Sequence, residues 1–203
     1  MIRTMSDTNL LVLYYSRNGA TRRLAELIAE GIESVPHCHA ILRTVPNVSA
    51  VSEATEKSIP DAGAAYAEYA DLISCDGLAV GSPTRFGNMA SAMKYFWDGS
   101  TAQWISGALA GKPACVFTST GSLHGGQEST LLSMMIPLMH HGMLLMGIPY
   151  SEVDLHTTST GGTPYGVSHL AGDRGQLPIS SSEEKLAIAQ GVRLATIAQQ
   201  LKK

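Results

Sequence analysis

The stretch from Leu10 to Thr21 constrains the fold of this chain more than any other. Its first part, Leu-Leu-Val-Leu-Tyr-Tyr, is an unbroken apolar and aromatic run, which is typical of a strand buried on both faces of a parallel sheet. Its second part, Ser-Arg-Asn-Gly-Ala-Thr, is polar and flexible, and apolar residues then recur at helical spacing from Leu24 to Val35. A buried strand, a hydroxyl-bearing turn and a helix N-terminus together predict an anion site, because backbone N–H groups and the positive helix end converge there.

The residues of this turn indicate which class of phosphate-binding loop it resembles. The pattern Gly-x-Gly-x-x-Gly is absent, which excludes the dinucleotide fingerprint, and the Gly-Lys pair at 111–112 precedes a proline and cannot form a Walker loop. The remaining pattern, Ser16-x-x-Gly19-x-Thr21, resembles the loop of flavodoxin-like proteins that wraps the terminal phosphate of FMN. The alternative is an ordinary helix cap, since Ser and Thr are favoured at helix starts.

Composition places the chain among ordinary globular proteins. The 203 residues are 44% hydrophobic and 15% charged, which fits a single domain over residues 1–203. The net charge of −3 leaves no electrostatic footprint for nucleic acid, so no nucleic-acid partner is expected. No apolar run approaches the roughly eighteen residues that span a bilayer, so no stable membrane insertion is expected.

Two features indicate the compartment. The first residues, Met-Ile-Arg-Thr-Met-Ser-Asp, lack the apolar core of a signal peptide. Cys38, Cys75 and Cys115 are odd in number, widely spaced and set in or beside apolar segments, which favours buried reduced thiols. A disulfide framework or a metal site is the alternative. We therefore expect a cytoplasmic protein.

Strand and helix patterns alternate five times along the chain. The predicted strands are residues 10–15, 37–45, 77–82, 113–119 and 143–148. The predicted helices are residues 24–35, 62–71, 89–97 and 129–141, and a last helix that opens with Ser181-x-x-Glu184 and ends near residue 201. This alternation predicts an α/β fold with a doubly wound parallel sheet and helices on both faces.

Two segments have no such periodicity. Residues 46–61 are polar and bracketed by prolines, which predicts a surface excursion. Residues 149–180 are rich in Gly, Pro and Thr, which predicts a long structureless connection. Such connections are uncommon in compact domains and are usually functional. The closeness of residues 149–180 to the expected site favours function over disorder.

Three loops after predicted strands are the most unusual segments of the chain. They are residues 16–21, 83–88 and 119–128, which are rich in Gly, Ser, Thr and Asn. Ligands of a doubly wound sheet bind beyond the carboxyl ends of its strands, so we expect these loops to meet in one site. Gly87 permits close approach to the face of a planar ring, and backbone N–H groups of the third loop suit a ring edge that gains negative charge. The alternatives are a surface turn for the second loop and a flexible hairpin-like loop for the third.

Four sequence blocks together resemble the WrbA-type NAD(P)H:quinone oxidoreductases. They are residues 82–89, residues 119–128, His140-His-Gly-Met143 and Gly161-Gly-Thr-Pro-Tyr-Gly166, and the likeness extends from the first strand to the last helix. The resemblance implies a flavodoxin-like sheet of five parallel strands in the order 2-1-3-4-5, bound FMN, and a homotetramer. It also implies two-electron reduction of quinones to hydroquinones by NADH or NADPH, in a ping-pong hydride transfer through flavin N5.

The same resemblance implies the residues of the site. No protein side chain is expected to act as acid, base or nucleophile, because the cofactor supplies the chemistry. Trp104 matches an aromatic of the family near the substrate, and Asn18 stands where the family commonly has an aromatic beside the nicotinamide. The implied cofactor contacts are Ser16, Arg17, Asn18, Gly19, Ala20, Thr21, Pro83, Thr84, Arg85, Phe86, Gly87, Asn88, Ser119, Thr120, Gly121, Ser122, Leu123, His124 and His140.

Two of these residues have an alternative interpretation. His140 and His141 are adjacent on a predicted helix, so one is expected to face the sheet or cofactor and the other solvent. His140 could simply be a histidine favoured by the helix C-terminus, and Trp104 could fill the core.

Two other functions are kept as hypotheses. A one-electron flavodoxin-type carrier would dock on basic partners through a strongly acidic surface, whereas this chain is close to neutral. A non-catalytic flavin-binding scaffold protein is the third hypothesis, and failure to bind flavin would favour a non-catalytic role.

Overall fold

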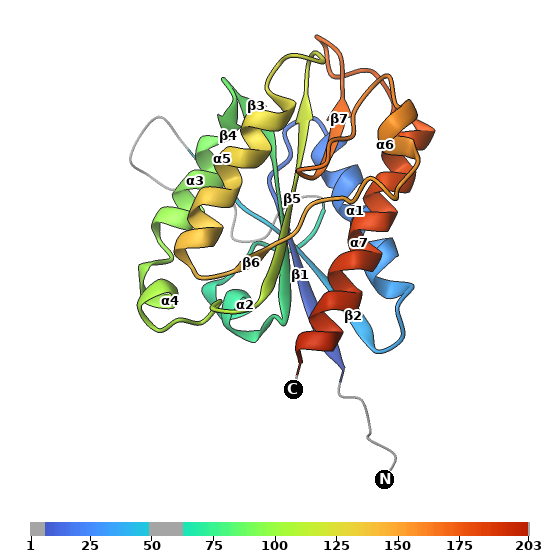
Figure 1. The fold of residues 1–203 in the computed structure, drawn as a ribbon. Coiled ribbons are helices and arrows are strands. Elements are labelled where there is room, and N and C mark those ends of the chain that lie inside the picture. The colour runs from blue at the N-terminus through green and yellow to red at the C-terminus, as the bar shows by residue number, and fades with distance from the viewer. Residues whose placement is uncertain (1–6, 49–62, 203) are drawn as a thin grey trace.

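The computed structural model describes residues 7–48 and 63–202, which form a parallel sheet between two layers of helices (Figure 1). Helices α1 and α7 lie on one side of the sheet in this view, and α3 and α5 lie on the other. The strands are β1 (Thr8–Tyr14), β2 (Cys38–Thr44), β3 (Gly77–Arg85), β4 (Asn88–Met89), β5 (Pro113–Thr120), β6 (Leu144–Leu145) and β7 (Val167–Leu170). The helices are α1 (Ala20–Glu33), α2 (Tyr69–Ser74), α3 (Ser91–Asp98), α4 (Thr101–Ile105), α5 (Gln127–His140), α6 (Asp154–Thr157) and α7 (Ser181–Leu201).

The strand order confirms the doubly wound sheet. The main path runs β2-β1-β3-β5-β6, with every neighbouring pair parallel. These are the five predicted strands, so the path is the expected order 2-1-3-4-5. One short hairpin is added, because β4 pairs antiparallel with the end of β3 through Arg85 and Asn88.

The buried residues of β1 alternate between the two helical layers. Leu10, Val12 and Tyr14 belong to the core beneath α1 and α7. Leu11 and Leu13 belong to the second core, which α3 and α5 cover. A strand whose two faces are both buried needs apolar residues at successive positions, which is the pattern that the sequence shows.

The segment 149–180 was wrongly predicted to be structureless. It contains α6 and β7, and β7 pairs in parallel with the second half of β5, from Phe117 opposite Val167 to Thr120 opposite Leu170. The predicted fifth strand is correspondingly short, since β6 pairs only with Pro113 and Ala114. Two short strands therefore share the edge position beside β5.

A glycine permits this arrangement at β7. Gly166 has φ of +158°, and a Cβ there would overlap the carbonyl oxygen of Val116 on β5. The backbone that leads into β7 can therefore approach β5 only without a side chain. This close approach is a tertiary requirement, so a search for strand periodicity does not detect it.

Three helix predictions need correction. Helix α2 begins at Tyr69 rather than at residue 62, which lies outside the described residues, as does most of the predicted excursion 46–61. Helix α4 was not predicted. The cap of α7 is Ser180 and not Ser181: its hydroxyl accepts a hydrogen bond from the N–H of Glu183, and the Glu183 side chain completes the capping box.

The three cysteines are buried and free. Burial raises the pKa of the Cys75 thiol to about 11 and that of Cys115 to about 12. Among the described residues no cluster of three or more His, Cys, Asp or Glu could hold a metal ion. None of the described helices is both long and apolar enough to span a bilayer.

Candidate functional site

The structure brings the three loops together at the carboxyl edge of the sheet, around a pocket of about 230 Å³. We call it the loop pocket. The first loop contributes Ser16, Arg17, Asn18, Ala20 and Thr21; β3 contributes Pro83, Thr84 and Arg85; β5 and the residue after it contribute Ser119, Thr120 and Gly121. Parallel strands end at one edge, so loops that are far apart in sequence meet there.

The first loop presents the start of α1 to this pocket. Gly19 occupies the N-cap position with φ of +91°, and its N–H donates to the Oγ of Ser16 at 3.1 Å. No described side chain caps the helix, and its first turn holds no acidic residue. Thr21, in that turn, is only 2% exposed. The first turn of α1 therefore has free N–H groups and a positive end, which suit an anion.

The second loop is the hairpin of β3 and β4. Phe86 and Gly87 form its tip with φ of +52° and +77°, and the Phe86 side chain is fully exposed. The hydroxyl of Thr84 lies 2.7 Å from that of Thr130 on α5, and Arg85 Nη1 donates to the Thr84 carbonyl at 2.7 Å. The structure thus places Thr84 and Arg85 at the loop pocket, whereas Phe86, Gly87 and Asn88 are not among its lining residues.

The third loop turns away from the pocket after Gly121. Thr120 Oγ1 donates to the carbonyl of Ser122 at 2.9 Å, and the N–H of Gly125 donates to the same carbonyl at 3.1 Å. Leu123 is 45% exposed, and His124 is exposed as well. Ser122, Leu123 and His124 are therefore outside the lining of the loop pocket in this single chain.

A fourth segment completes the loop pocket. It lies within residues 149–180, which were expected to be functional, but its residues were not among the implied contacts. It is the turn after β7, which contributes Ala171, Gly172, Asp173 and Gly175. The N–H of Ala171 donates to the carbonyl of Thr120 at 2.8 Å, which places the turn beside the end of β5. The signal that could have found it is the Gly-Asp-Arg-Gly run at 172–175, which is typical of a tight turn.

A buried carboxylate holds this fourth segment in place. Glu183, at the start of α7, is fully buried and accepts hydrogen bonds from the N–H groups of Gly161, Leu170 and Ser180 at 2.7, 3.0 and 2.7 Å. Its other strong contact is Nδ1 of His169 on β7, at 3.0 Å. Burial alone would raise the pKa of Glu183, but these hydrogen bonds outweigh it and lower the pKa to about 2.

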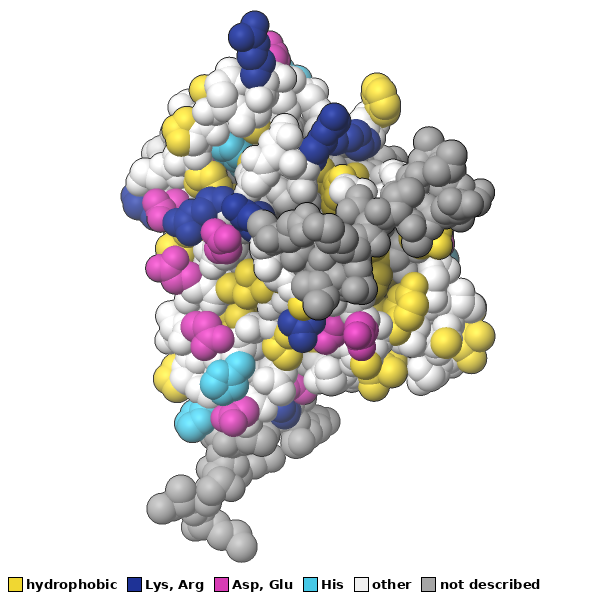
Figure 2. All heavy atoms as spheres, turned by 180° about the vertical axis from the view of Figure 1, so that it is seen from behind, with side chains coloured by type: hydrophobic (Ala, Val, Ile, Leu, Met, Phe, Trp, Pro, Cys, Tyr) yellow, Lys and Arg dark blue, Asp and Glu magenta, His cyan; other side chains and the backbone are white. Residues whose placement is uncertain are grey.

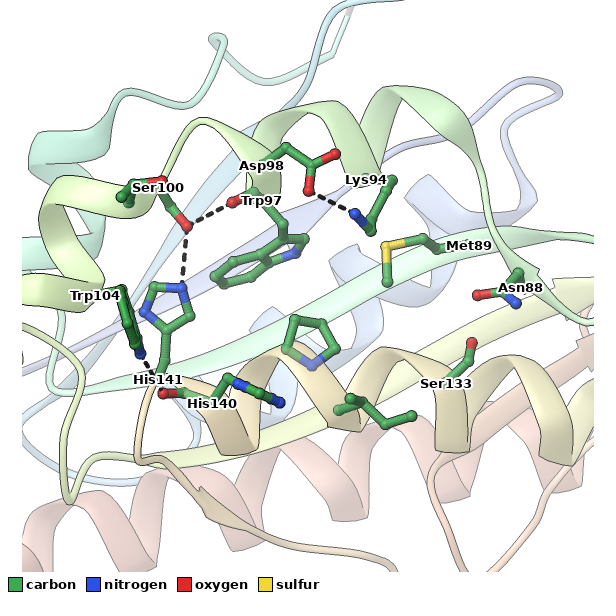
Figure 3. A pocket seen from close by; sticks show the side chains of 13 residues that line it. Asn88, Met89, Lys94, Trp97, Asp98, Ser100, Trp104, Ser133, His140 and His141 are labelled. Carbon is green, nitrogen blue, oxygen red and sulfur yellow. Dashed lines mark hydrogen bonds and ion pairs between the residues drawn. The ribbon is translucent and has the colours of Figure 1, made fainter.

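Trp104 and His140 lie together in a second cavity, a groove of about 540 Å³ between α3, α4 and α5 (Figure 3). The indole N–H of Trp104 donates to the backbone carbonyl of His140 at 2.8 Å. Trp104 is 52% exposed, so it does not fill the core; the buried tryptophan is Trp97.

The two adjacent histidines differ as expected in their surroundings. His140 is exposed in the groove. His141 is buried, with its ring 5.3 Å from that of Trp97 and its Nε2 atom 3.0 Å from the Ser100 hydroxyl. Burial and the neighbouring His140 lower the pKa of His141, which favours the neutral imidazole.

The groove and the loop pocket share none of the described residues that line them. Helix α5 begins beside the second and third loops and ends at His140; its 14 residues extend about 20 Å along the helix axis. Within one chain, His140 and Trp104 therefore lie far from the start of α1. The structure separates two groups of residues that were expected to share one site.

Comparison with known proteins identifies similar sequences and folds. Residues 8–157 match the family described as NADPH-dependent FMN reductase. A relative named NAD(P)H dehydrogenase (quinone) from Syntrophobacter fumaroxidans is 43% identical over 199 residues, which cover 95% of this chain and 98% of the relative. A relative of the same name from Geobacter sulfurreducens is 39% identical over 200 residues, with coverage of 95% and 98%.

Solved structures agree with the fold. A flavodoxin, WrbA-like protein from Agrobacterium tumefaciens superposes with a TM-score of 0.66 at 26% identity, covering 97% of this chain and all of that one. Flavodoxin 1 from Bacillus cereus has a TM-score of 0.60 at 17% identity and covers 93% of this chain and 98% of its own. The second likeness supports the fold alone.

Proposed function

This chain belongs to the NADPH-dependent FMN reductase family, and from this membership we propose that it is an FMN-dependent NAD(P)H:quinone oxidoreductase. Two relatives named NAD(P)H dehydrogenase (quinone) match nearly the whole chain. The single observation that carries the proposal is the uncapped start of α1 in a pocket where the loops after β1, β3 and β5 meet. We further propose that residues 1–203 form one FMN-binding domain.

The loop pocket fits the phosphate of FMN. Free N–H groups of the first turn of α1, the hydroxyls of Ser16 and Thr21, and the absence of any acidic residue from that turn suit a phosphate. Asp173, on the turn after β7, is the one acidic residue among the described residues that line the pocket. We propose that the remaining implied contacts, from Thr84 to Arg85 and from Ser119 to Gly121, hold the rest of the cofactor.

Bound FMN would supply the atom that accepts and donates hydride. The chain's own contribution is binding and orientation. Ser119 and Thr120 are almost fully buried at the end of β5, so their positions are set by the sheet rather than by a mobile loop. Rigid placement of donors at the cofactor edge stabilises the charge that develops there.

We propose that quinone binds in the groove of Trp104 and His140, and that assembly brings this groove to a cofactor. The end of the groove that holds Trp104 and His140 lies more than three turns of α5 from the loop pocket of its own chain. Helix α5 also exposes Leu132, Ile136 and Met139 at 44%, 53% and 54%, at helical spacing on one face. A homotetramer that buries this face would remove apolar surface from water. The proposed location is the cytoplasm, where free thiols stay reduced.

An absorption spectrum of the purified protein tests the function. We expect flavin bands near 370 and 450 nm that bleach on anaerobic addition of NADH or NADPH and return on addition of benzoquinone. Electron paramagnetic resonance at half-reduction should show no dominant radical. A dominant radical would favour the one-electron carrier, and a colourless protein that does not take up added FMN would refute the proposal.

A further inference from the structure

We propose that Arg17 and Arg85 bind the phosphate groups of the nicotinamide co-substrate in a cavity beside the loop pocket. We call this cavity the cationic groove. Its volume is about 620 Å³, and Lys94, Tyr15 and Ser91 also line it. The proposal rests on the proposed function, because it assigns a place to the second substrate of that reaction.

The charge of the cationic groove is unbalanced. Among the described residues that line it, three are cations and none is acidic. Neither Arg17 nor Arg85 forms an ion pair with a carboxylate of the described residues, and Arg85 donates only to the carbonyl of Thr84. Lys94 is the exception, since it pairs with Asp98 one turn along α3. Two guanidinium groups without a carboxylate partner among the described residues thus lie at one cavity, and the planar set of N–H donors on each suits phosphate.

A neighbouring cavity of about 450 Å³ provides the contrast. It also has an arginine in its lining, Arg23, beside the same first loop. The guanidinium of Arg23 lies 3.6 Å from a carboxylate oxygen of Glu26 and 3.8 Å from one of Glu184. Glu184 also lines that cavity. Its cation is therefore neutralised, which makes the cationic groove the better site for an anion.

The start of α3 adds to the positive potential. Helix α3 begins at Ser91 in the wall of the cationic groove, has no side-chain cap from the described residues and has no acidic residue in its first turn. Tyr15, which follows β1, also lines the cationic groove, and its hydroxyl donates to the Oδ1 atom of Asn47. Figure 2 shows the molecule from behind, and most of the Lys and Arg side chains visible in that view lie in its upper half.

The location of the groove decides which phosphate compound it takes. The cationic groove shares Arg17 and Arg85 with the loop pocket, and it shares Asn88, Met89 and Lys94 with the groove of Trp104. A ligand whose phosphates lie here adjoins the proposed flavin site. Nicotinamide dinucleotides fit this position, because they join the reactive ring to an anionic pyrophosphate. NADPH has a further 2′-phosphate. The cavity is thus a place for the anionic part of the co-substrate.

Two phosphate compounds without a nicotinamide test the binding apart from hydride transfer. We expect ADP and 2′,5′-ADP to bind the FMN-saturated protein in calorimetry, and Arg17→Gln or Arg85→Gln to weaken binding about ten- to a hundred-fold. If the variants bind only 2′,5′-ADP more weakly, the arginines contact the 2′-phosphate of NADPH. If they bind both probes more weakly, the arginines contact the pyrophosphate. Either result supports the cationic groove.

Kinetics and a control complete the test. In the variants the KM for NADPH should rise while the KM for the quinone stays unchanged. Arg193→Gln, on the exposed face of α7, should leave probe affinity unchanged. Because Arg17 and Arg85 also line the loop pocket, FMN content is measured in each variant and excess FMN is added.

Unchanged probe affinity in both arginine variants, or no binding of either probe to the wild-type protein, would overturn the proposal. This failure can be told from failure of the proposed function. If only the cationic groove is wrong, NADPH still bleaches the flavin of the wild-type protein. If the proposed function is wrong, NADPH does not bleach the flavin, whatever the probes do.

Discussion

The Nδ1 atom of His169 lies 3.0 Å from the Oε2 atom of Glu183, and each side chain is 1% exposed. This contact joins β7 to the start of α7. The same carboxylate receives three backbone N–H groups, including that of Leu170, which directly precedes the turn 171–175. One buried group thus fixes the edge strand, the last helix and the fourth wall of the loop pocket.

The first prediction concerns acid stability. The folded-state pKa of Glu183, about 2, lies below its ordinary value of 4.5, so its ionised form stabilises the folded state. That stabilisation is complete above pH 4.5, is lost as pH falls from 4.5 towards 2, and amounts to roughly 3 kcal/mol. Glu183→Gln should therefore lower the free energy of unfolding most at neutral pH and progressively less in acid.

Denaturant unfolding at pH 7 and at pH 3 checks this expectation. Glu184→Gln is the control, because Glu184 is the next residue but its side chain is 49% exposed, so its change should stay within about 0.5 kcal/mol. Equal destabilisation by Glu183→Gln at both pH values would contradict the role of the ionised carboxylate.

The second prediction concerns the contact of α1 with α7. A Cβ at Gly191 would overlap the backbone carbonyl oxygen of Ile28. Gly to Ala stabilises an exposed helix interior by about 1 kcal/mol. Here we expect Gly191→Ala to destabilise the protein by roughly 1–3 kcal/mol, since the helices must move apart. Thr196→Ala, at an exposed position of the same helix, should be neutral or slightly stabilising, and a higher melting temperature for Gly191→Ala would refute the close approach.

The third prediction concerns FMN. Thr21→Ala removes a hydroxyl from the start of α1, and loss of one hydrogen bond to a charged group, roughly 1.5–3 kcal/mol, should weaken FMN about ten- to a hundred-fold. Thr21→Ser keeps the hydroxyl and should bind almost as the wild type does. Fluorescence titration of the apoprotein with FMN measures both, and equal affinity of the alanine variant would show that the Thr21 hydroxyl does not bind the phosphate.

The fourth prediction separates cofactor binding from folding. Ala20 is the first residue of α1 and is partly exposed in the loop pocket. Ala20→Asp places a carboxylate against the proposed phosphate, so FMN affinity should fall by more than in Thr21→Ala. The same carboxylate suits the positive end of the helix, so the melting temperature of the apoprotein should hold or rise slightly. A variant that keeps FMN at full affinity would place the phosphate elsewhere.

The fifth prediction concerns assembly. Light scattering should give about four times the chain mass of 21.5 kDa for the wild type. Ile136→Lys, on the exposed apolar face of α5, should shift the protein to smaller species and lower quinone reduction together. Ile73→Lys on α2, where the side chain is 57% exposed, is the matched control and should stay tetrameric. A wild-type monomer with full activity at micromolar concentration would contradict the predicted tetramer.

Local sequence was sufficient for the frame of the fold. The apolar run at 10–15 predicted a strand buried on both faces, and β1 is such a strand, with Leu10 and Leu11 in opposite cores. The meeting of the first three loops followed from one topological rule, because parallel strands end at the same edge. These features depend on neighbours along the chain and on a general property of parallel sheets.

The register of the last helix shows where local information ends. The run Ser-Ser-Ser-Glu-Glu at 180–184 contains the capping pattern twice, once from Ser180 to Glu183 and once from Ser181 to Glu184. The structure uses the first, because Glu183 is the residue that His169 and three backbone N–H groups surround. The sequence pattern permits both registers, and only long-range contacts distinguish them.

Tertiary structure alone decided three further features. The four residues of β7 are too few to show a period, and they form a strand because β5 and Glu183 supply partners from elsewhere in the chain. The separation of Trp104 and His140 from the start of α1 follows from the length of α5. The cationic groove exists because the fold places Arg17 beside Arg85, which are 68 positions apart. Sequence by itself determined the five strands of the main path and the helices α1, α3, α5 and α7, whereas contacts between distant residues decided the edge strand β7 and what the loops enclose.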